Sequence, residues 1–221
     1  MEELSSVDVV NKHVEYMTKS LLSVDKLQVK KMLMELKESY EPIAIVERII
    51  VPSLEQIGEG WMTDTVSLSQ VYMSGKICSE ILDDVIPHEQ INRQQQLKMA
   101  IATLEDFHTL GKQIVKGFLY ASGFEVADYG GGLTVGSLVE RVIRDKTDVL
   151  LISVLMLPSA LSIKEVRKQL RERHAATIIV AGGAPFNFDD ELFKEVEADY
   201  AGRTVSDAIH IVRTLENNKG V

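Results

Sequence analysis

Short apolar runs rich in β-branched residues alternate with amphipathic helical patterns five times in the second half of the chain. The strand-like runs cover residues 97–103, 124–130, 148–155, 176–183 and 198–203. The helical patterns that follow them cover residues 110–122, 135–145, 161–173, 189–197 and 205–216. Helices that connect parallel strands cross over with a right hand and cover the faces of the sheet. The alternation therefore predicts a doubly wound α/β domain with a five-stranded parallel sheet.

The first 88 residues contain helical patterns only, joined by short connections. These patterns cover residues 10–23, 25–39, 41–62 and 67–86. Asp25 and Ser67 are suited to cap the second and fourth helices, and Pro42 suits a first helical turn. Pro52 is expected to kink or restart the third helix. Four such helices predict a small four-helix bundle.

A polar segment without periodicity, "PHEQINRQQQ", separates the two halves. Domain boundaries commonly fall in exposed polar linkers of this kind. We therefore predict a helical-bundle domain over residues 1–88, a linker over residues 89–96 and an α/β domain over residues 97–221.

Composition and charge exclude several classes of protein. Of the 221 residues 45% are apolar, which is typical of a folded chain and not of a disordered one. The net charge of −9, from 24 basic and 33 acidic residues, argues against nucleic-acid binding through phosphate contacts. We find neither a secretion signal nor an apolar run long enough for a bilayer, and expect a cytoplasmic protein without membrane partners. The single cysteine, Cys78, excludes an internal disulfide and is expected to be a small core residue.

Polar side chains suited to chemistry lie in three loops that follow predicted strands. These are residues 106–111 after the first strand, 153–159 after the third and 182–185 after the fourth. Parallel α/β sheets bind ligands at the carboxyl ends of their strands, so we expect the loops to converge at one edge. The first loop holds Asp106 and His108. A carboxylate in such a pair can accept from one ring nitrogen and leave the other free to bind a metal.

Other chemistries fit these loops less well. The glycine-rich segment "DYGGGLTVG", residues 128–136, lacks the lysine of a phosphate-binding loop and is otherwise expected to be a flexible turn. No serine after the third strand is flanked by the glycines of a hydrolase nucleophile elbow. Asp106 alone does not supply the acidic cluster of a receiver domain. A helix cap beside an idle histidine is the simplest alternative to a metal ligand.

Taken together, the three loops resemble the signature of the cobalamin-binding domain family. The matching elements are Asp-x-His-x-x-Gly at 106–111, Ser-x-Leu at 153–155 and Gly-Gly at 182–183, with gaps of 41 and 26 residues that fit the spacing of the family. Residues 57–77 resemble the helical cap that precedes the corrinoid domain in methionine synthase and in small methanogen-type corrinoid proteins. The resemblance therefore covers nearly the whole chain, from about residue 5 to residue 216. It implies a four-helix bundle cap followed by a flavodoxin- or Rossmann-like domain.

The resemblance also implies a role for each matching residue. His108 would coordinate the cobalt from below in place of the cofactor's own base, Asp106 would orient His108, and Ser159 would bond to Asp106 and complete a proton relay. Glycines and hydroxyl residues at the strand ends would line a slot for the cofactor's nucleotide tail, and Tyr200 would close its far end. The residues of the α/β domain expected to contact cobalamin are Asp106, His108, Thr109, Leu110, Gly111, Ser153, Leu155, Ser159, Gly182, Gly183 and Tyr200.

In the cap, four residues share one helix face by their i, i+3, i+4 and i+7 spacing and are expected to cover the upper side of the corrin. They are Gln70, Met73, Ser74 and Ile77, and Trp61 is a further candidate. Packing in the core of the bundle is the alternative for all four. Three positions depart from the family pattern, because Thr109 replaces a second acid, Leu157 a hydroxyl residue and Gln70 an aromatic residue.

By this resemblance the chain is expected to be a corrinoid methyl carrier, one subunit of a methyltransferase system. It would hold cobalamin with the base displaced and His108 bound, alternating between the cob(I)alamin and methylcobalamin states, while the cofactor performs the chemistry. Separate methyltransferase subunits and a reductive activation protein are the expected partners. Two alternatives stay open: a cobalamin-based sensor without its own DNA-binding domain, and the small subunit of an adenosylcobalamin mutase, which the helical cap disfavours.

Overall fold

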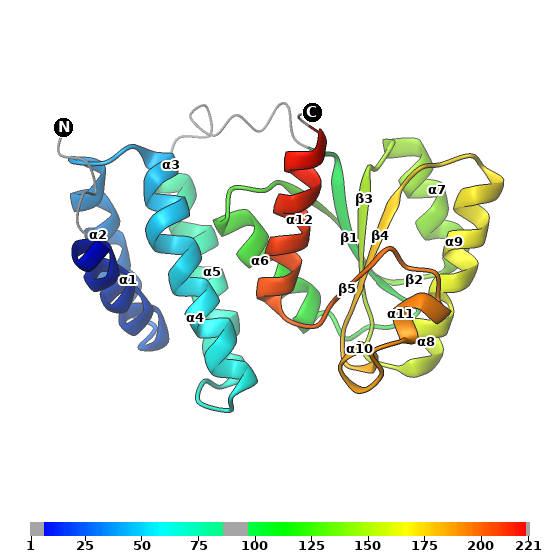
Figure 1. Cartoon of the computed structure of the whole chain (residues 1–221), viewed down its shortest axis with the longest axis horizontal. Helices are drawn as coiled ribbons and strands as arrows, with labels where there is room; N and C mark the ends of the chain where they lie inside the picture. The colour runs from blue at the N-terminus through cyan, green and yellow to red at the C-terminus, as the bar shows by residue number, and fades with distance from the viewer. Residues whose placement is uncertain (1–6, 86–96, 220–221) are drawn as a thin grey trace. The chain divides into compact units, whose positions relative to one another are not determined.

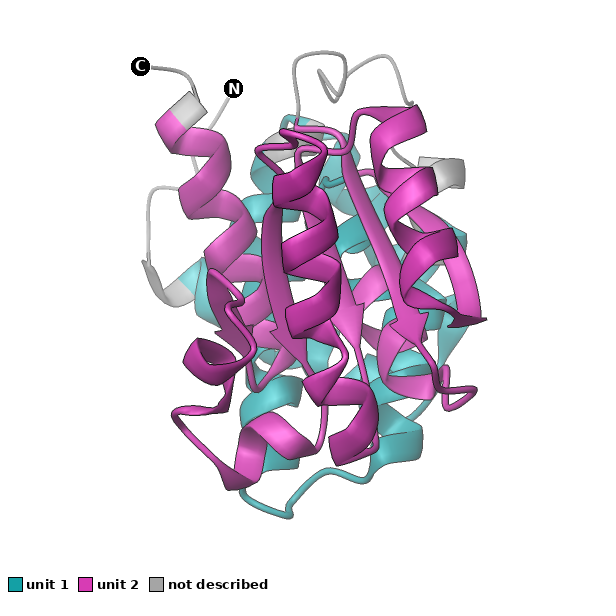
Figure 2. Cartoon of the chain, turned by 90° about the vertical axis from the view of Figure 1, so that its right-hand side faces the viewer, with its two compact units in different colours: residues 1–94, 117–124 teal, residues 95–116, 125–221 magenta. Residues whose placement is uncertain are grey.

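The computed structural model describes residues 7–85 and 97–219 (Figure 1). The chain divides into two compact units, and each is treated separately below (Figure 2). Unit 1 contains the described residues up to 85 together with Gly117–Phe124, and unit 2 contains the other described residues. The predicted linker, residues 89–96, lies outside the described residues, so the domain boundaries stay a prediction.

Unit 1 is built from the predicted helices. They are α1 (Val7–Leu22), α2 (Lys26–Lys37), α3 (Pro42–Ile45), the π-helical turn η1 (Val46–Ile50), α4 (Val51–Met62) and α5 (Leu68–Val85). Both predicted caps are confirmed: Asp25 accepts from the N–H of Gln28 at 3.0 Å, and Ser67 accepts from the N–H of Gln70 at 3.3 Å. The α-helix restarts at Pro52 as predicted, since the π-helical turn ends at Ile50 and Pro52 lies in the first turn of α4.

The apolar stripes of these helices are buried. Met17 and Leu21 of α1, Ile49 of η1 and Leu54 of α4 are all fully buried. Cys78 of α5 is buried as predicted, and burial raises the pKa of its thiol to about 12. A thiol with such a pKa stays protonated at neutral pH and is a poor nucleophile.

Unit 2 holds the predicted five-stranded parallel sheet. The strands are β1 (Met99–Leu104), β2 (Val126–Leu133), β3 (Val149–Ser153), β4 (Ile178–Gly182) and β5 (Tyr200–Gly202), in the spatial order β2-β1-β3-β4-β5. The helices that follow the strands are α6 (Leu110–Ala121), of which the residues from Gly117 onward belong to unit 1, α7 (Val135–Asp145), α8 (Leu157–Leu161), α9 (Ile163–Glu172), α10 (Pro185–Phe188), α11 (Leu192–Glu195) and α12 (Val205–Lys219). Helices α7 and α9 cover one face of the sheet, and α12 and the start of α6 cover the other (Figure 1).

Alternate side chains of β1 enter different layers of unit 2. Ala100, Ala102 and Leu104 join the apolar core beneath α7 and α9, where Leu138 and Val166 are fully buried. The other side chains of β1 face the layer of α6 and α12, since successive side chains of a strand point to opposite faces. The sheet therefore has one strictly apolar face and one face that can carry polar groups at its carboxyl edge.

Two predicted helices are shorter than their patterns. The helix expected at 161–173 begins only at Ile163, because the short helix α8 ends at Leu161. The helix expected at 189–197 shrinks to Leu192–Glu195. There the carboxylate of Asp189 accepts from the N–H of Glu191 at 2.9 Å, an alternative to helical hydrogen bonding that Asp commonly provides.

Candidate functional site

The carboxyl ends of β1 and β3 form the switch point of the sheet, where connections leave in opposite directions. Sheets with this strand order bind ligands in the crevice at that point. Two predicted loops meet here, since the N–H of Leu155 after β3 donates to the Oδ2 atom of Asp106 after β1 at 2.8 Å. The expected convergence of these two loops is therefore confirmed.

Asp106 is a buried carboxylate with three N–H partners. Its Oδ1 atom accepts from the backbone N–H of His108 at 2.9 Å and lies 2.6 Å from the ring Nδ1 of His108, in addition to the Leu155 contact. Burial alone would raise the pKa of Asp106. The backbone hydrogen bonds from His108 and Leu155 and the His108 ring outweigh this effect and lower the pKa to about 2. Asp106 is therefore ionised at neutral pH and a firm acceptor for His108.

His108 presents one ring nitrogen outward. With Nδ1 donating to Asp106, the lone pair belongs to Nε2, which is the tautomer that can bind a metal. The His108 side chain is 66% exposed, whereas that of Asp106 is 2% exposed. The pair thus has the geometry of an orienting carboxylate behind an accessible nitrogen ligand.

Ser159 does not complete the predicted relay. Its hydroxyl donates to the backbone oxygen of Glu105 at 3.1 Å, and the Asp106 oxygens are already taken by His108 and Leu155. Glu105 adopts a positive φ of 45°, and its carboxylate also accepts from Ser162 at 2.7 Å. The predicted Ser159–Asp106 hydrogen bond is wrong for this structure: Ser159 supports the backbone immediately before Asp106.

A row of small residues crosses the carboxyl edge of the sheet. Thr103, Ser153, Gly182 and Gly202 are register partners on the neighbouring strands β1, β3, β4 and β5. Ser153 faces the first turn of α6, where its hydroxyl would lie 3.6 Å from a Cβ atom added at Gly111. Apart from its chain neighbours and the backbone of its own helix, nothing else in the described chain lies within 4 Å of that position, so Gly111 leaves room for a ligand beside Ser153.

The other two predicted glycines serve the protein's own backbone. A Cβ atom at Gly182 would lie 2.8 Å from the carbonyl oxygen of Gly202. At Gly183, which has a φ of +117°, it would lie 1.8 Å from the carbonyl oxygen of Val154. The close approach of backbone from another segment therefore explains why both positions are glycine. Gly111 differs, because no backbone of another segment lies that close to it.

The glycine-rich segment is not a flexible turn but the bulged end of β2. The N–H of Gly132 donates to the carbonyl oxygen of Asp106 at 2.7 Å. A Cβ atom at Gly132 would lie 2.3 Å from the Phe107 ring, and one at Gly131 would lie 2.9 Å from Thr109. These glycines let β2 pack against the loop that carries His108, a role that sequence reasoning missed.

Lys112 is a second residue that sequence reasoning missed. It is buried in the first turns of α6 and forms an ion pair with Asp128 of β2, while Lys116 lies 3.7 Å from the same carboxylate. The pair ties α6 to the strand whose bulged end supports the His108 loop. A buried lysine without such a partner would be costly.

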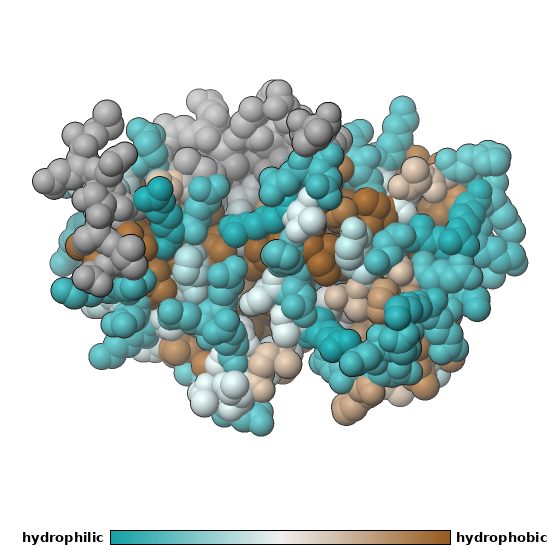
Figure 3. All heavy atoms as spheres, in the orientation of Figure 1, coloured by the Kyte–Doolittle hydropathy of each residue, from teal (hydrophilic) through white to brown (hydrophobic). Residues whose placement is uncertain are grey.

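Exposed apolar side chains lie on and beside the two loops that meet at Asp106. We call this set the apolar rim, and its exposed members are Phe107, Leu110, Leu155, Met156 and Leu157. Phe188 of α10 is 90% exposed, and Figure 3 shows apolar side chains at the surface over α10. Thr109 is half-buried beside Gly131, and Tyr200 opens β5 opposite Val180. An apolar rim around a nitrogen ligand suits a large ring-shaped cofactor.

The residues predicted for the cap all lie in unit 1. Gln70 completes a capping box, because its Oε1 atom accepts from the N–H of Ser67 at 3.0 Å while its Nε2 atom donates to the Leu22 carbonyl at 3.2 Å. Ser74 and Ile77 are buried, and Met73 is half-buried. Gln70 thus has a structural role, and contact of these residues with a cofactor stays a prediction.

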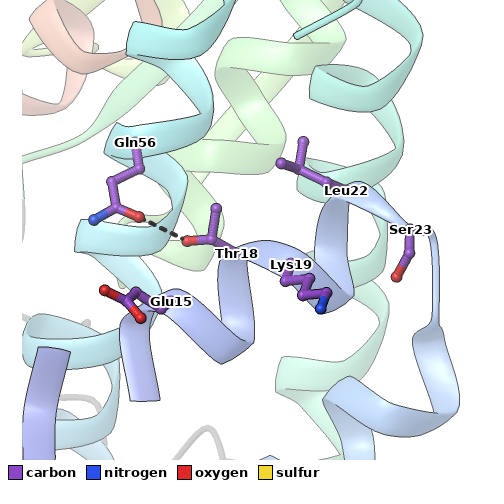
Figure 4. Close-up of a pocket in the computed structure, with 6 residues that line it drawn as sticks. All are labelled: Glu15, Thr18, Lys19, Leu22, Ser23 and Gln56. Atoms are coloured by element: carbon purple, nitrogen blue, oxygen red, sulfur yellow. Dashed lines mark hydrogen bonds between the residues drawn. The ribbon is translucent and has the colours of Figure 1, made fainter. Parts of the chain in front are cut away.

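Unit 1 also has an open hollow of about 430 Å³ on α1 and α4 (Figure 4). Thr18 and Gln56 in its wall are joined by a 3.0 Å hydrogen bond. The other lining residues are Glu15, Lys19, Leu22 and Ser23. The hollow shares no residue with the strand-end site. Within residues 7–85 and 97–219, moreover, no helix has the length and apolar character needed to cross a membrane.

Comparison with known proteins places these features in a family. A model of the B12 binding domain matches residues 98–209, which is 112 of the 221 residues, and a second B12 binding domain model matches residues 14–84. The chain is 28% identical to the trimethylamine corrinoid protein of Methanosarcina barkeri, over 80% of this chain and 83% of that protein. It is 25% identical to monomethylamine corrinoid protein 2 of Methanosarcina mazei, over 94% and 97%.

Solved structures share the fold. A cobalamin-binding protein from Desulfitobacterium hafniense aligns with a TM-score of 0.74 at 20% identity, over 91% of this chain and 97% of that one. A chain of the methanol:cobalamin methyltransferase complex from Methanosarcina barkeri aligns with a TM-score of 0.67 at 19% identity, over 94% and 80%. The first family model spans more than half of this chain and includes all three strand-end elements. The chain therefore belongs to the B12 binding domain family.

Proposed function

We propose that this chain is a corrinoid methyl carrier, which binds cobalamin with its own base displaced and His108 in the lower axial position. The observation that carries the proposal is the 2.6 Å contact between Asp106 and the Nδ1 atom of His108 at the switch point of the sheet. This pair lies inside the segment that the B12 binding domain model matches. The names of the relatives, which are corrinoid proteins for trimethylamine and monomethylamine, support a methyl-carrying role.

The residues of the site fit cobalamin in four respects. His108 offers one outward nitrogen, which is what a cobalt already held by a macrocycle needs from the protein. The apolar rim offers a surface for the macrocycle, and the space beside Gly111 offers a path for the nucleotide tail. Thr103, next to that path, carries a buried hydroxyl with no hydrogen-bond partner in the described residues. The donor set is therefore suited to this cofactor.

The protein's own residues supply orientation. Bound cobalamin supplies a cobalt centre that accepts and donates methyl groups. Asp106 holds the His108 ring by Nδ1 and stays ionised, since its pKa is about 2. With Nδ1 held by Asp106, the lone pair of Nε2 is the one that would bind the cobalt. Because Ser159 bonds elsewhere, it does not extend the Asp106–His108 pair into a three-residue relay.

The partners follow from the same proposal. In this proposal one methyltransferase loads the methyl group onto the bound cofactor and another removes it. The methanol:cobalamin methyltransferase complex, which contains a structural neighbour of this chain, supports separate methyltransferase subunits. A reductive activation protein and a cytoplasmic location belong to the proposal too, and a methylamine is the class of donor that the relatives favour.

Reconstitution tests the proposal. After unbound cofactor is removed, the purified protein is expected to retain cobalamin and, once reduced, to show the absorbance of methylcobalamin when methylamine and a methylamine methyltransferase are added. Omission of the methyltransferase is the control. Failure to retain any cobalamin would refute the proposal. Tight dark binding of adenosylcobalamin, released by light, without methylation under any condition would instead favour the sensor function.

A further inference from the structure

Thr103 of β1 has a buried polar group that the fold leaves unsatisfied. Its side chain is fully buried, and its Oγ1 atom has no hydrogen-bond partner among the described residues. Most buried hydroxyls in folded proteins are hydrogen-bonded, so each exception needs an explanation. Valine has the same shape and equal suitability for a strand, and would fill this position without burying an unpaired hydroxyl. The fold of unit 2 alone gives no reason for threonine here.

The position of Thr103 connects it to the space beside Gly111. Thr103 is the register partner of Ser153, so the two side chains lie next to each other on the face of the sheet that α6 covers. Beyond the chain neighbours and helix backbone of Gly111, the Ser153 hydroxyl is the one described group within 4 Å of a Cβ atom added there. On its other side, Thr103 has its Cβ atom 3.7 Å from the Cβ position of Gly131. The unpaired hydroxyl thus lies within a group of residues that have small side chains or none.

Thr103 is fully buried, so a ligand reaches its hydroxyl only if the structure opens locally. The first turn of α6 is the place where this costs least, because at Gly111 it presents no side chain to Ser153. The ion pair between Lys112 and Asp128 need not break, since the long lysine side chain can follow a small shift. Opening the site at this turn would expose the hydroxyls of Thr103 and Ser153 together.

We propose that Thr103 is a specificity-determining residue for the lower base of the cofactor, to which its hydroxyl donates a hydrogen bond. The inference rests on the proposed function, in which the displaced base enters this region. A benzimidazole base that no longer binds cobalt has a ring nitrogen with a free lone pair, and burial of that nitrogen without a donor is unfavourable. A phenolic lower base has no ring nitrogen. Thr103 therefore favours cobamides with a nitrogen-containing base over phenolic ones.

Thr103→Val tests the inference, with Thr177→Val as its matched control. Thr177 is also buried, but its hydroxyl donates to the carbonyl oxygen of Thr147 at 2.9 Å, away from the row of small residues. Affinities for a benzimidazolyl and a phenolyl cobamide are measured by equilibrium dialysis, and the stability of the cofactor-free proteins by denaturant unfolding. Thr103→Val is expected to lower affinity for the benzimidazolyl cobamide about 10-fold, to leave the phenolyl cobamide unchanged and to unfold at no lower denaturant concentration than wild type. Thr177→Val is expected to unfold earlier and to bind both cobamides as wild type does.

The outcomes separate this inference from the proposed function. If the wild type binds neither cobamide, the proposed function is wrong. If the wild type binds, two results would show that Thr103 does not recognise the base. In one, Thr103→Val binds both cobamides as tightly as the wild type does; in the other, it binds both more weakly by the same factor. A cofactor-free Thr103→Val protein that is less stable than wild type would show that the hydroxyl has a structural partner. Thr103→Ser, which retains the hydroxyl, is expected to keep the preference and covers the case in which the valine variant does not fold.

Discussion

Gly183→Ala is expected to prevent unit 2 from reaching its folded state. The new Cβ atom would lie 1.8 Å from the carbonyl oxygen of Val154 and 2.9 Å from its carbonyl carbon, both of which are backbone atoms that cannot rotate away. The φ of +117° adds strain for any residue with a side chain. We expect the free energy of unfolding to fall by more than about 4 kcal/mol, a loss that consumes much of the stability of an ordinary domain. Denaturant unfolding followed by circular dichroism measures it.

Gly136→Ala is the control for this change. Gly136 lies in α7, and beyond its chain neighbours and its own helix backbone no described atom is within 4 Å of its Cβ position. The variant is expected to gain up to about 1 kcal/mol of stability from the higher helix propensity of alanine. If Gly183→Ala unfolds at the same denaturant concentration as wild type, the packing of the β4 loop against Val154 is wrong.

Gly111→Ala is expected to keep the fold and lose the cofactor. In the first turn of α6 the added methyl group would be 3.6 Å from the Ser153 hydroxyl, which is an ordinary contact distance. The same methyl group would occupy the space that we assign to the nucleotide tail. Steric crowding of about 2–3 kcal/mol corresponds to a loss of roughly 100-fold in cobalamin affinity.

The stability of Gly111→Ala separates the two effects. Unfolding of the cofactor-free variant is expected to match or exceed that of wild type, because alanine favours a helix. Equilibrium dialysis with cobalamin gives the affinity, and Gly136→Ala again serves as the control because its methyl group is remote from the strand-end row. An undiminished affinity of Gly111→Ala would place the tail elsewhere.

The fold was largely predictable from the sequence because its signals are local. The alternation of strand and helix patterns after residue 97 specifies a parallel sheet, and Asp25 and Ser67 cap the helices as their residue types predict. The spacing Ser67-x-x-Gln70 is itself a capping-box pattern, so the structural role of Gln70 could also have been read from the chain.

The parts of the site that escaped prediction depend on contacts between distant segments. Ser159 was expected to reach Asp106, but the positive φ of Glu105 and the hydrogen bond from Leu155 decide its partner. The glycines after Tyr129 were expected to form a flexible turn, yet they are required by Phe107 and Thr109 in another loop. Thr103 looks like any strand threonine until its hydroxyl is found buried without a partner in the described chain. None of these relations leaves a periodic or local signal.

In the proposed function, the Nε2 atom of His108 replaces the cofactor's own base on cobalt. Electron paramagnetic resonance of the protein loaded with cob(II)alamin distinguishes the two nitrogens, because the axial nitrogen splits the cobalt lines according to its nuclear spin. With nitrogen-15 in the histidines, we expect each axial splitting to change from a triplet to a doublet, and His108→Ala to abolish this change. A triplet that persists in the labelled protein would show that the cofactor's own base stays coordinated and that His108 is not the ligand.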